Sequence, residues 1–148
     1  MSTRADFYVG RGVEAEWLGS IAHDGYPSSI PPAIKMAAAE DAYRVAVTEL
    51  LVSRMEKDAT LAGDGWPWGW DDSRTTDYAY AFAEGACWGS YFGGPWFDPL
   101  TTNPSETQDW IEYEDRLVFP VFPDMHNRRN VAPAGSPRSG VQVRREAV

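Results

Sequence analysis

The sequence is poor in cysteine and in long apolar stretches. Among 148 residues there is one cysteine, Cys87, so the chain can form neither an internal disulfide nor a paired-cysteine metal site. Such sparse cysteine is typical of a reducing compartment, and we predict a cytoplasmic protein. No apolar run approaches the ~20 residues that a membrane helix needs, and the N-terminus lacks the apolar core of a signal peptide. We therefore expect no membrane contact.

Basic residues are also scarce, and they are unevenly placed. The chain has 13 basic and 22 acidic residues, a net charge of −9. Residues 1–125 hold 8 basic and 21 acidic groups, a net charge of −13, whereas residues 126–148 hold five arginines and one glutamate, a net charge of +4. An acidic body is unsuited to gripping phosphates, so we expect no sequence-specific nucleic-acid binding. The Arg/Pro/Gly-rich segment 126–148 lacks aromatic residues and is predicted to be a flexible tail.

The first 125 residues have the composition of a single globular domain. Apolar residues make up 43% of the chain and aromatic residues 14%, which is enough for a core. Apolar and β-branched runs at residues 6–10 and 16–22 flank a loop with two glycines and predict a β-hairpin. In this hairpin Phe7 and Val9 share one face, as do Trp17 and Ile21.

A second hairpin is predicted at residues 76–83 and 86–92 around Glu84-Gly85. A two-residue loop places Phe82 opposite Cys87 and Tyr80 opposite Gly89. The other face of these strands is rich in alanine, so we expect a helix to dock closely there. A third hairpin at residues 110–121 competes with a helix that a capping-box pattern at Ser105 favours. Residues 96–103 are predicted to form a loop.

Residues 31–57 carry the helical periodicity of the chain. Two prolines at the start suit a first helical turn, and apolar side chains recur every three or four residues up to Met55. The predicted fold is therefore α+β: an antiparallel sheet of two or three β-hairpins with one long helix packed on a face, and a basic disordered C-terminal tail.

Two residue groups suggest catalysis but have simpler interpretations. Cys87 with His23 or His126 would be a nucleophile and its base, yet a thiol on the aromatic face of a strand favours a buried structural cysteine. Asp71, Asp72 and Asp77 would offer carboxylates to a metal or to acid–base chemistry. Their spacing matches no ligand template, and Asp72 precedes Ser-Arg-Thr-Thr, a sequence typical of turns. We predict no bound metal, no cofactor and no assigned catalytic residue.

Three tryptophans within five residues are the strongest indication of a binding site in this sequence. Trp66, Trp68 and Trp70 alternate with Pro67 and Gly69 in a segment too rich in glycine for regular structure. Their indoles either cap the open end of the core or form a platform for a partner, because Trp is the residue most enriched in binding hot spots. Trp68, in the middle of the loop, is the predicted anchor.

Several segments resemble one group of bacterial proteins. These are ADFYVGRG at residues 5–12, EWLGSIA at residues 16–22, DGYP at residues 24–27 and DSRTTDYAYAF at residues 72–82. They resemble small accessory proteins carried on integrative elements, plasmids and prophages of Proteobacteria. The resemblance implies cargo of mobile DNA that lies near genes countering host defence, and it supplies no catalytic residue.

The leading functional hypothesis is a non-enzymatic, acidic protein-binding module. The resemblance sharpens it to a mobile-element-encoded, anti-CRISPR-like inhibitor of a host defence complex, with a basic, nucleic-acid-handling complex as partner. The predicted partner-binding residues are Trp66, Trp68, Trp70, Asp71 and Asp72. Two alternatives remain open: a small hydrolase or metal-dependent enzyme using Asp71, Asp72 and Asp77, and a carbohydrate-binding module using the tryptophan loop.

Overall fold

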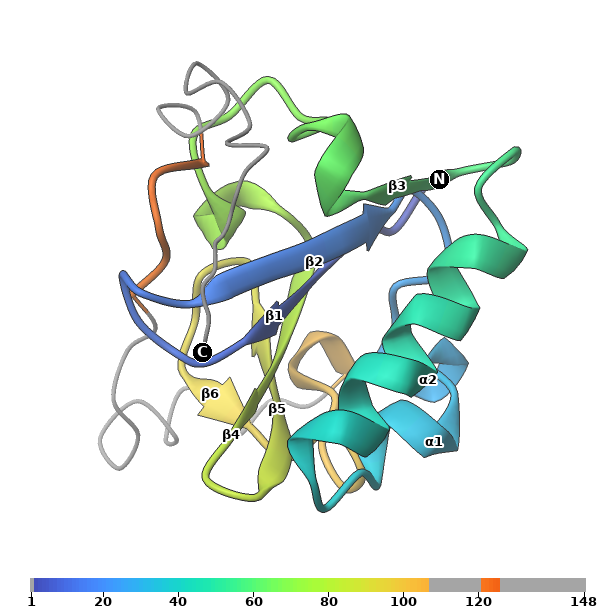
Figure 1. Ribbon diagram of the computed structural model, residues 1–148. Helices are drawn as coiled ribbons and strands as arrows, with labels where there is room; N and C mark the ends of the chain where they lie inside the picture. Colours follow the sequence, from blue (N-terminus) through green and yellow to red (C-terminus); the bar gives the residue numbers. More distant parts are fainter. Residues whose placement is uncertain (1, 107–120, 126–148) are drawn as a thin grey trace.

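The computed structural model describes residues 2–106 and 121–125, which form a six-stranded sheet with helices on one side (Figure 1). This confirms the α+β class. The strands are β1 (Ala5–Val9), β2 (Glu16–Ile21), β3 (Ala59–Leu61), β4 (Tyr78–Ala83), β5 (Ala86–Tyr91) and β6 (Trp96–Phe97). The helices are α1 (Pro32–Lys35) and α2 (Glu40–Ser53), and four short 3-10 turns are η1 (Pro27–Ser29), η2 (Ala62–Asp64), η3 (Ser73–Thr75) and η4 (Pro104–Glu106).

The sheet is mixed, so the prediction of a purely antiparallel sheet is wrong. Its strand order is β3-β2-β1-β4-β5-β6, and β1 pairs with β4 in parallel while the other pairs are antiparallel. A parallel pair needs a long crossover, and here the connection contains both helices. The sheet also gains β3 and β6, which have three and two residues. Strands this short leave no readable alternation, and β6 lies where a loop was predicted.

The second hairpin has the predicted register. Phe82 lies opposite Cys87 and Tyr80 opposite Gly89. Glu84 and Gly85 both have positive φ, +56° and +78°, as a two-residue turn that matches the strand twist requires. The ring of Phe97 lies against Gly89, where an added Cβ would come within 2.7 Å of a ring carbon. A glycine is therefore needed for β6 to approach β5.

The first hairpin also forms, but one inference about its faces is wrong. Phe7 pairs with Gly19 while Tyr8 pairs with Trp17, so Leu18 is an extra residue in β2. Such a bulge moves the following side chains to the opposite face. Trp17 therefore packs with Tyr8, and Ile21 packs with Phe7 on the other side of the sheet.

The predicted helix over residues 31–57 is divided. α1 ends at Lys35, and Ala39 is extended with φ −137° and ψ 148° before α2 begins. Glu40 and Asp41 occupy the first turn of α2, where negative charge favours a new helix start. Met55 lies beyond α2 and is exposed. The helical periodicity is confirmed only within α2, whose buried residues are Tyr43, Ala46, Val47 and Leu51.

The helices pack on the aromatic face of the sheet, not on the alanine face as predicted. Tyr43 of α2 contacts the ring of Phe82 and donates from its hydroxyl to the carbonyl of Tyr80 at 3.2 Å. Small side chains on the other face, Ala79 and Ala81, leave room that large aromatic side chains fill instead. These are Trp17, Trp66, Trp96 and Phe122. Figure 1 shows residues 62–77 and 121–125 on that side, away from α1 and α2.

Some predictions fall on other parts of the chain. The predicted third hairpin lies outside the described residues except for Val121, which is in no strand, and the tail at 126–148 lies outside them entirely. Within residues 2–106 and 121–125, no helix is long and apolar enough to cross a membrane.

Candidate functional site

The tryptophan loop covers the alanine face of the sheet, and Trp66 is its buried part. Trp66 is 5% exposed and meets Trp17 edge-on, with ring centroids 5.1 Å apart. Its Nε1 donates to the carbonyl oxygen of Trp70 at 2.6 Å, which folds the loop back on itself. Trp66 therefore has the position of a core cap, one of the two roles weighed for this loop.

Trp68 and Trp70 form a stacked pair at the edge of that cap. Their rings lie 5.5 Å apart and 13° from parallel, and both residues are half-buried. Trp68 donates from Nε1 to Oδ1 of Asp6 at 2.7 Å, and Trp70 donates from Nε1 to Oγ1 of Thr76 at 2.9 Å. The guanidinium of Arg4 lies over both rings, 5.5 and 5.7 Å from their centroids. We call Trp68 and Trp70 the indole pair.

Asp6 holds the indole pair to the sheet, and sequence reasoning missed it. It lies in β1, is 0% exposed, and accepts hydrogen bonds from the hydroxyls of Ser20 at 2.6 Å and Ser73 at 2.5 Å besides the Trp68 indole. Burial raises the pKa of this carboxyl, while the hydrogen bonds act in the opposite direction. The hydroxyl of Tyr8 lies 2.7 Å from that of Ser73 and extends the network. The available signal was a carboxylate inside an apolar strand.

The structure separates the three candidate carboxylates. Asp72 is buried, caps η3, and binds the guanidinium of Arg74 through both oxygens. Asp77 accepts the backbone N–H of Arg4 at 2.8 Å. Asp71 is exposed, and its carbonyl oxygen accepts the N–H of Met125 at 2.6 Å. Among the described residues, no group of three His, Cys, Asp or Glu side chains is placed to hold a metal ion.

Arg74 lies among several acidic residues beside the loop. Its pKa is raised, first by the hydrogen bond to Asp72 and further by the charges of Asp71 and Asp124. Its side chain is 67% exposed. A cation surrounded in this way adds little net positive charge to the surface.

Phe92 is a second residue of this region that sequence reasoning missed as a candidate site residue. The Phe92-Gly93 turn follows β5, and Phe92 has φ +50° with its side chain 57% exposed. Positive φ is a genuine outlier for a bulky residue and costs ~1–3 kcal/mol. The N–H of Phe92 donates to the carbonyl of Asp77 at 2.9 Å, and Gly93 packs against the backbone of Arg74. The turn and the indole pair therefore contact the same segment, residues 74–77.

Cys87 lies on the helix-covered face, away from the loop. It is 4% exposed, and burial raises the pKa of its thiol to about 12. A neutral, buried thiol is a poor nucleophile, in agreement with the structural interpretation.

Comparison of the sequence with protein-family models finds no match. Comparisons with the curated proteins and with the solved structures find no match either.

Proposed function

We propose that this protein is a non-enzymatic, acidic protein-binding module whose contact surface contains Trp68, Trp70, Asp71 and Phe92. The observation that carries the proposal is the fixed, half-exposed indole pair. Each indole N–H has a partner within the protein, at 2.7 Å for Trp68 and 2.9 Å for Trp70. Their rings stack at 5.5 Å. The pair therefore loses little conformational freedom when a partner docks.

Phe92 supports the same surface for a different reason. The strained turn leaves this large ring 57% exposed, and it makes a tilted ring contact with Tyr91 at 6.5 Å between centroids. Backbone strain of this kind persists mainly where it serves a contact. Aromatic side chains flanking the 74–77 segment from two sides would give a partner one continuous apolar contact.

Charge indicates the chemistry of the partner. Residues 1–125 carry 21 acidic and 8 basic groups. The described arginines are paired with the protein's own carboxylates: Arg4, Arg11, Arg44, Arg54 and Arg74. The surface that remains is acidic, which favours a basic partner and faster association with it.

A basic, nucleic-acid-handling complex is the partner class that we propose. An acidic module with aromatic anchors suits the positively charged channels of such complexes. Together with the resemblance to mobile-element proteins, this extends the proposal to an anti-CRISPR-like inhibitor of a host defence complex.

The two alternatives gain less support. A sugar ring would need to lie flat on an indole face, where the Arg4 guanidinium lies over both rings, whereas a protein side chain can also contact the ring edges. A hydrolase built on Asp71, Asp72 and Asp77 would use carboxylates of which two are engaged, Asp72 with Arg74 and Asp77 with Arg4.

The proposal is tested by affinity purification of the tagged full chain from its native host, followed by mass spectrometry. We expect the wild-type chain and a Trp88→Ala control to recover the same basic complex, and Trp70→Ala to lose it. Trp88 is a suitable control because it is half-buried on the same face and is likewise covered by an arginine, Arg11, at 4.7 Å. Recovery of one complex by all three chains would contradict the proposed surface.

The electrostatic part has its own test. Association of the purified complex should slow as salt rises, since exposed charges are screened within about 8–10 Å at physiological ionic strength. Nucleic acid bound by the complex should compete with the protein. If the association rate is unchanged by salt and nucleic acid does not compete, the proposal that the protein binds a basic channel is contradicted.

A further inference from the structure

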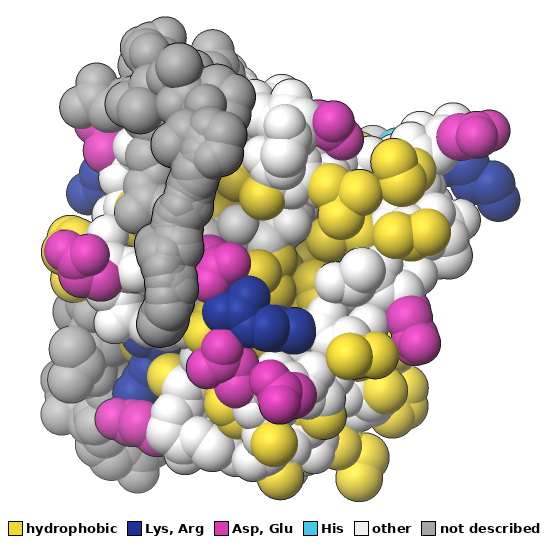
Figure 2. All heavy atoms as spheres, in the orientation of Figure 1, with side chains coloured by type: hydrophobic (Ala, Val, Ile, Leu, Met, Phe, Trp, Pro, Cys, Tyr) yellow, Lys and Arg dark blue, Asp and Glu magenta, His cyan; other side chains and the backbone are white. Residues whose placement is uncertain are grey.

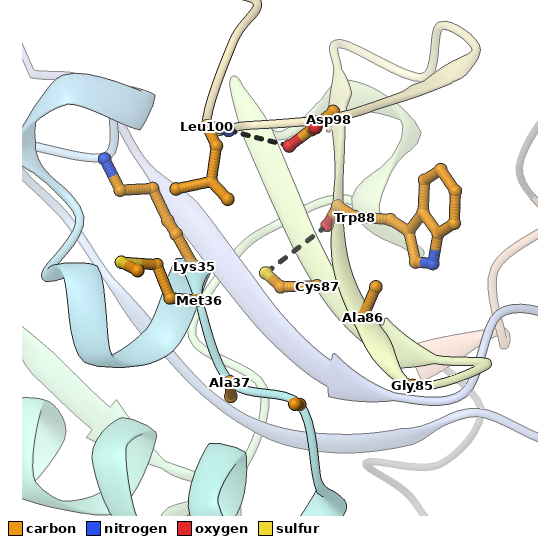
Figure 3. A pocket seen from close by; sticks show the side chains of 10 residues that line it. Lys35, Met36, Ala37, Gly85, Ala86, Cys87, Trp88, Asp98 and Leu100 are labelled. Carbon is orange, nitrogen blue, oxygen red and sulfur yellow. Dashed lines mark hydrogen bonds between the residues drawn. The ribbon is translucent and has the colours of Figure 1, made fainter.

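A cavity of about 220 Å³ opens on the helix-covered side, between α1 and the start of β5 (Figure 3). Cys87 forms its floor, Ala37 and Met36 line one wall, and Leu100 lies across from them. Sites for drug-sized ligands and cofactors usually measure ~300–1,000 Å³, whereas a cavity of ~150 Å³ can hold benzene. The volume therefore fits one bulky side chain rather than a nucleotide or a large cofactor.

The side chains that line this cavity are mainly apolar, and two of them, Met36 and Leu100, are exposed to solvent. Cys87 is 4% exposed and behaves as a small apolar group. Met36 is 65% exposed and Leu100 is 52% exposed, although they lie on either side of the same hollow. Within the described chain these two side chains gain little burial, so an apolar group entering the cavity would cover surface that is now in water.

The charged groups at the rim differ in their availability. Lys35 lines the cavity with its carbon stem, and its Nζ turns away from Cys87 and donates to the carbonyl of Pro27 at 2.7 Å. Asp98 is exposed, accepts the N–H of Leu100 at 2.9 Å, and forms no ion pair within the described residues. The rim therefore offers a carboxylate to a cation.

We propose that this cavity receives one bulky apolar side chain of a partner segment, with a neighbouring basic residue of that segment pairing with Asp98. The inference rests on the proposed function for the basic character of the partner. It adds a second contact on the opposite face of the sheet from the indole pair, so the two contacts can be tested apart.

The direct probe is a pair of blocked dipeptides, acetyl-Arg-Phe-amide and acetyl-Glu-Phe-amide, added to the full chain labelled at its alanine methyl groups. We expect acetyl-Arg-Phe-amide at millimolar concentration to shift the NMR signals of Ala37 and Ala86, which line the cavity. It should bind at least ~3-fold more tightly than the glutamate peptide, because Asp98 attracts one and repels the other. Absence of shifts with both peptides would overturn the proposal.

Three variants sharpen the result. Asp98→Asn keeps an acceptor for the Leu100 N–H but removes the charge, so it should abolish the difference between the two peptides. Leu100→Ser should weaken both peptides, whereas Val52→Ser on α2 should not, although Val52 is equally exposed at 54% against 52% for Leu100. Equal losses for the two serine variants would contradict binding in the cavity.

The exposed face of α2 is a suitable control for non-specific binding of the peptides to apolar surface. Figure 2 shows hydrophobic side chains gathered on the side where α2 lies in Figure 1, interspersed with acidic ones. Val45, Val52 and Met55 are among the exposed residues there or just beyond the helix. A peptide that merely prefers apolar surface would bind there too, and Val52→Ser would then weaken it.

The outcomes separate the two proposals. If Trp70→Ala loses the native partner and neither peptide shifts the signals of Ala37 and Ala86, the proposal that the cavity binds a side chain is contradicted. The proposed function is then still supported. Peptide binding in the cavity, with no native partner recovered by the wild-type chain, would support the cavity and contradict the proposed function.

Discussion

Replacing Asp6 with alanine should loosen the indole pair from the sheet. The carboxylate accepts hydrogen bonds from Ser20, Ser73 and Trp68 in a site that is 0% exposed. Alanine removes the acceptor of all three donors, and each buried donor left unsatisfied costs ~1–3 kcal/mol before any offset. The two hydroxyls can turn toward other oxygens, and loss of a buried carboxylate removes a desolvation cost. We therefore expect a net loss of about 2–4 kcal/mol from the free energy of unfolding.

Urea and thermal unfolding, followed by circular dichroism and tryptophan fluorescence, measure this loss. A decrease of 2–4 kcal/mol corresponds to a fall in Tm of roughly 10 °C for a chain of this size. The fluorescence of the folded variant should shift to longer wavelength, because the Trp68 indole loses the Asp6 acceptor and gains contact with water. An Asp6→Ala protein within ~1 kcal/mol of the wild type would refute the reasoning that this carboxylate holds the loop.

Asp6→Asn is the matched control. The amide keeps an acceptor for Ser20 and Trp68, and its NH2 can donate to Ser73, whose hydroxyl can turn to Tyr8 at 2.7 Å. We expect it to remain within ~1 kcal/mol of the wild type at neutral pH. Because the pKa of Asp6 is raised in the folded state, the wild type takes up protons on folding at pH values between the unfolded and the folded pKa. The stability of the wild type relative to Asp6→Asn should therefore rise as pH falls through that raised pKa. A difference in the free energy of unfolding that does not change with pH would contradict the raised pKa.

Three further predictions concern single sites. Trp66→Ala should lower the free energy of unfolding by ~3–5 kcal/mol in urea, the range for a buried tryptophan, and a loss below ~1 kcal/mol would contradict its role as a cap. Cys87 should react with a thiol reagent far more slowly in the native protein than in an unfolded control, and equal rates would reopen its role as a nucleophile. For Asp58, burial raises the pKa but the hydrogen bond and charge of Arg54 outweigh it, so the folded pKa is lowered. Its stabilising contribution is present above the unfolded pKa of ~4 and lost as pH falls through the folded value, so the deficit of Asp58→Asn against the wild type should shrink in acid.

Local pairings were predictable from the sequence because they depend on neighbouring residues. Glu84-Gly85 fixes a two-residue turn, and the turn fixes every partner along β4 and β5. The parallel pairing of β1 with β4 joins residues about seventy positions apart, and no local signal marks it. β3 and β6 are likewise set by contacts from elsewhere in the chain.

The faces of the sheet were harder to predict than its strands. One bulged residue, Leu18, places Trp17 on the opposite face of the sheet from Ile21, and no sequence feature predicts the bulge. The alanines of β4 predict space for a helix, yet the indoles of Trp17, Trp66 and Trp96 fill that space. Small side chains predict that something packs closely, not what it is.

The residue types of the candidate site could be predicted from the sequence, but their arrangement could not. The cluster of indoles is visible in the sequence. Its division into a buried Trp66 and a stacked outer pair depends on Asp6, which is 62 positions from Trp68, and on Thr76, which belongs to no recognisable motif. Phe92 was predicted as the end of a strand, because a positive φ at a bulky residue contradicts local preference.

The dissociation constant of Trp70→Ala for the purified native partner tests the central claim most directly. Trp88→Ala serves as the control, and the Tm of each variant is measured alongside. The account predicts weakening by at least ~30-fold for Trp70→Ala, equivalent to ~2 kcal/mol, with most of the protein folded and with Trp88→Ala close to the wild type. A dissociation constant within ~3-fold of the wild type for folded Trp70→Ala would contradict the claim that the indole pair is the binding surface.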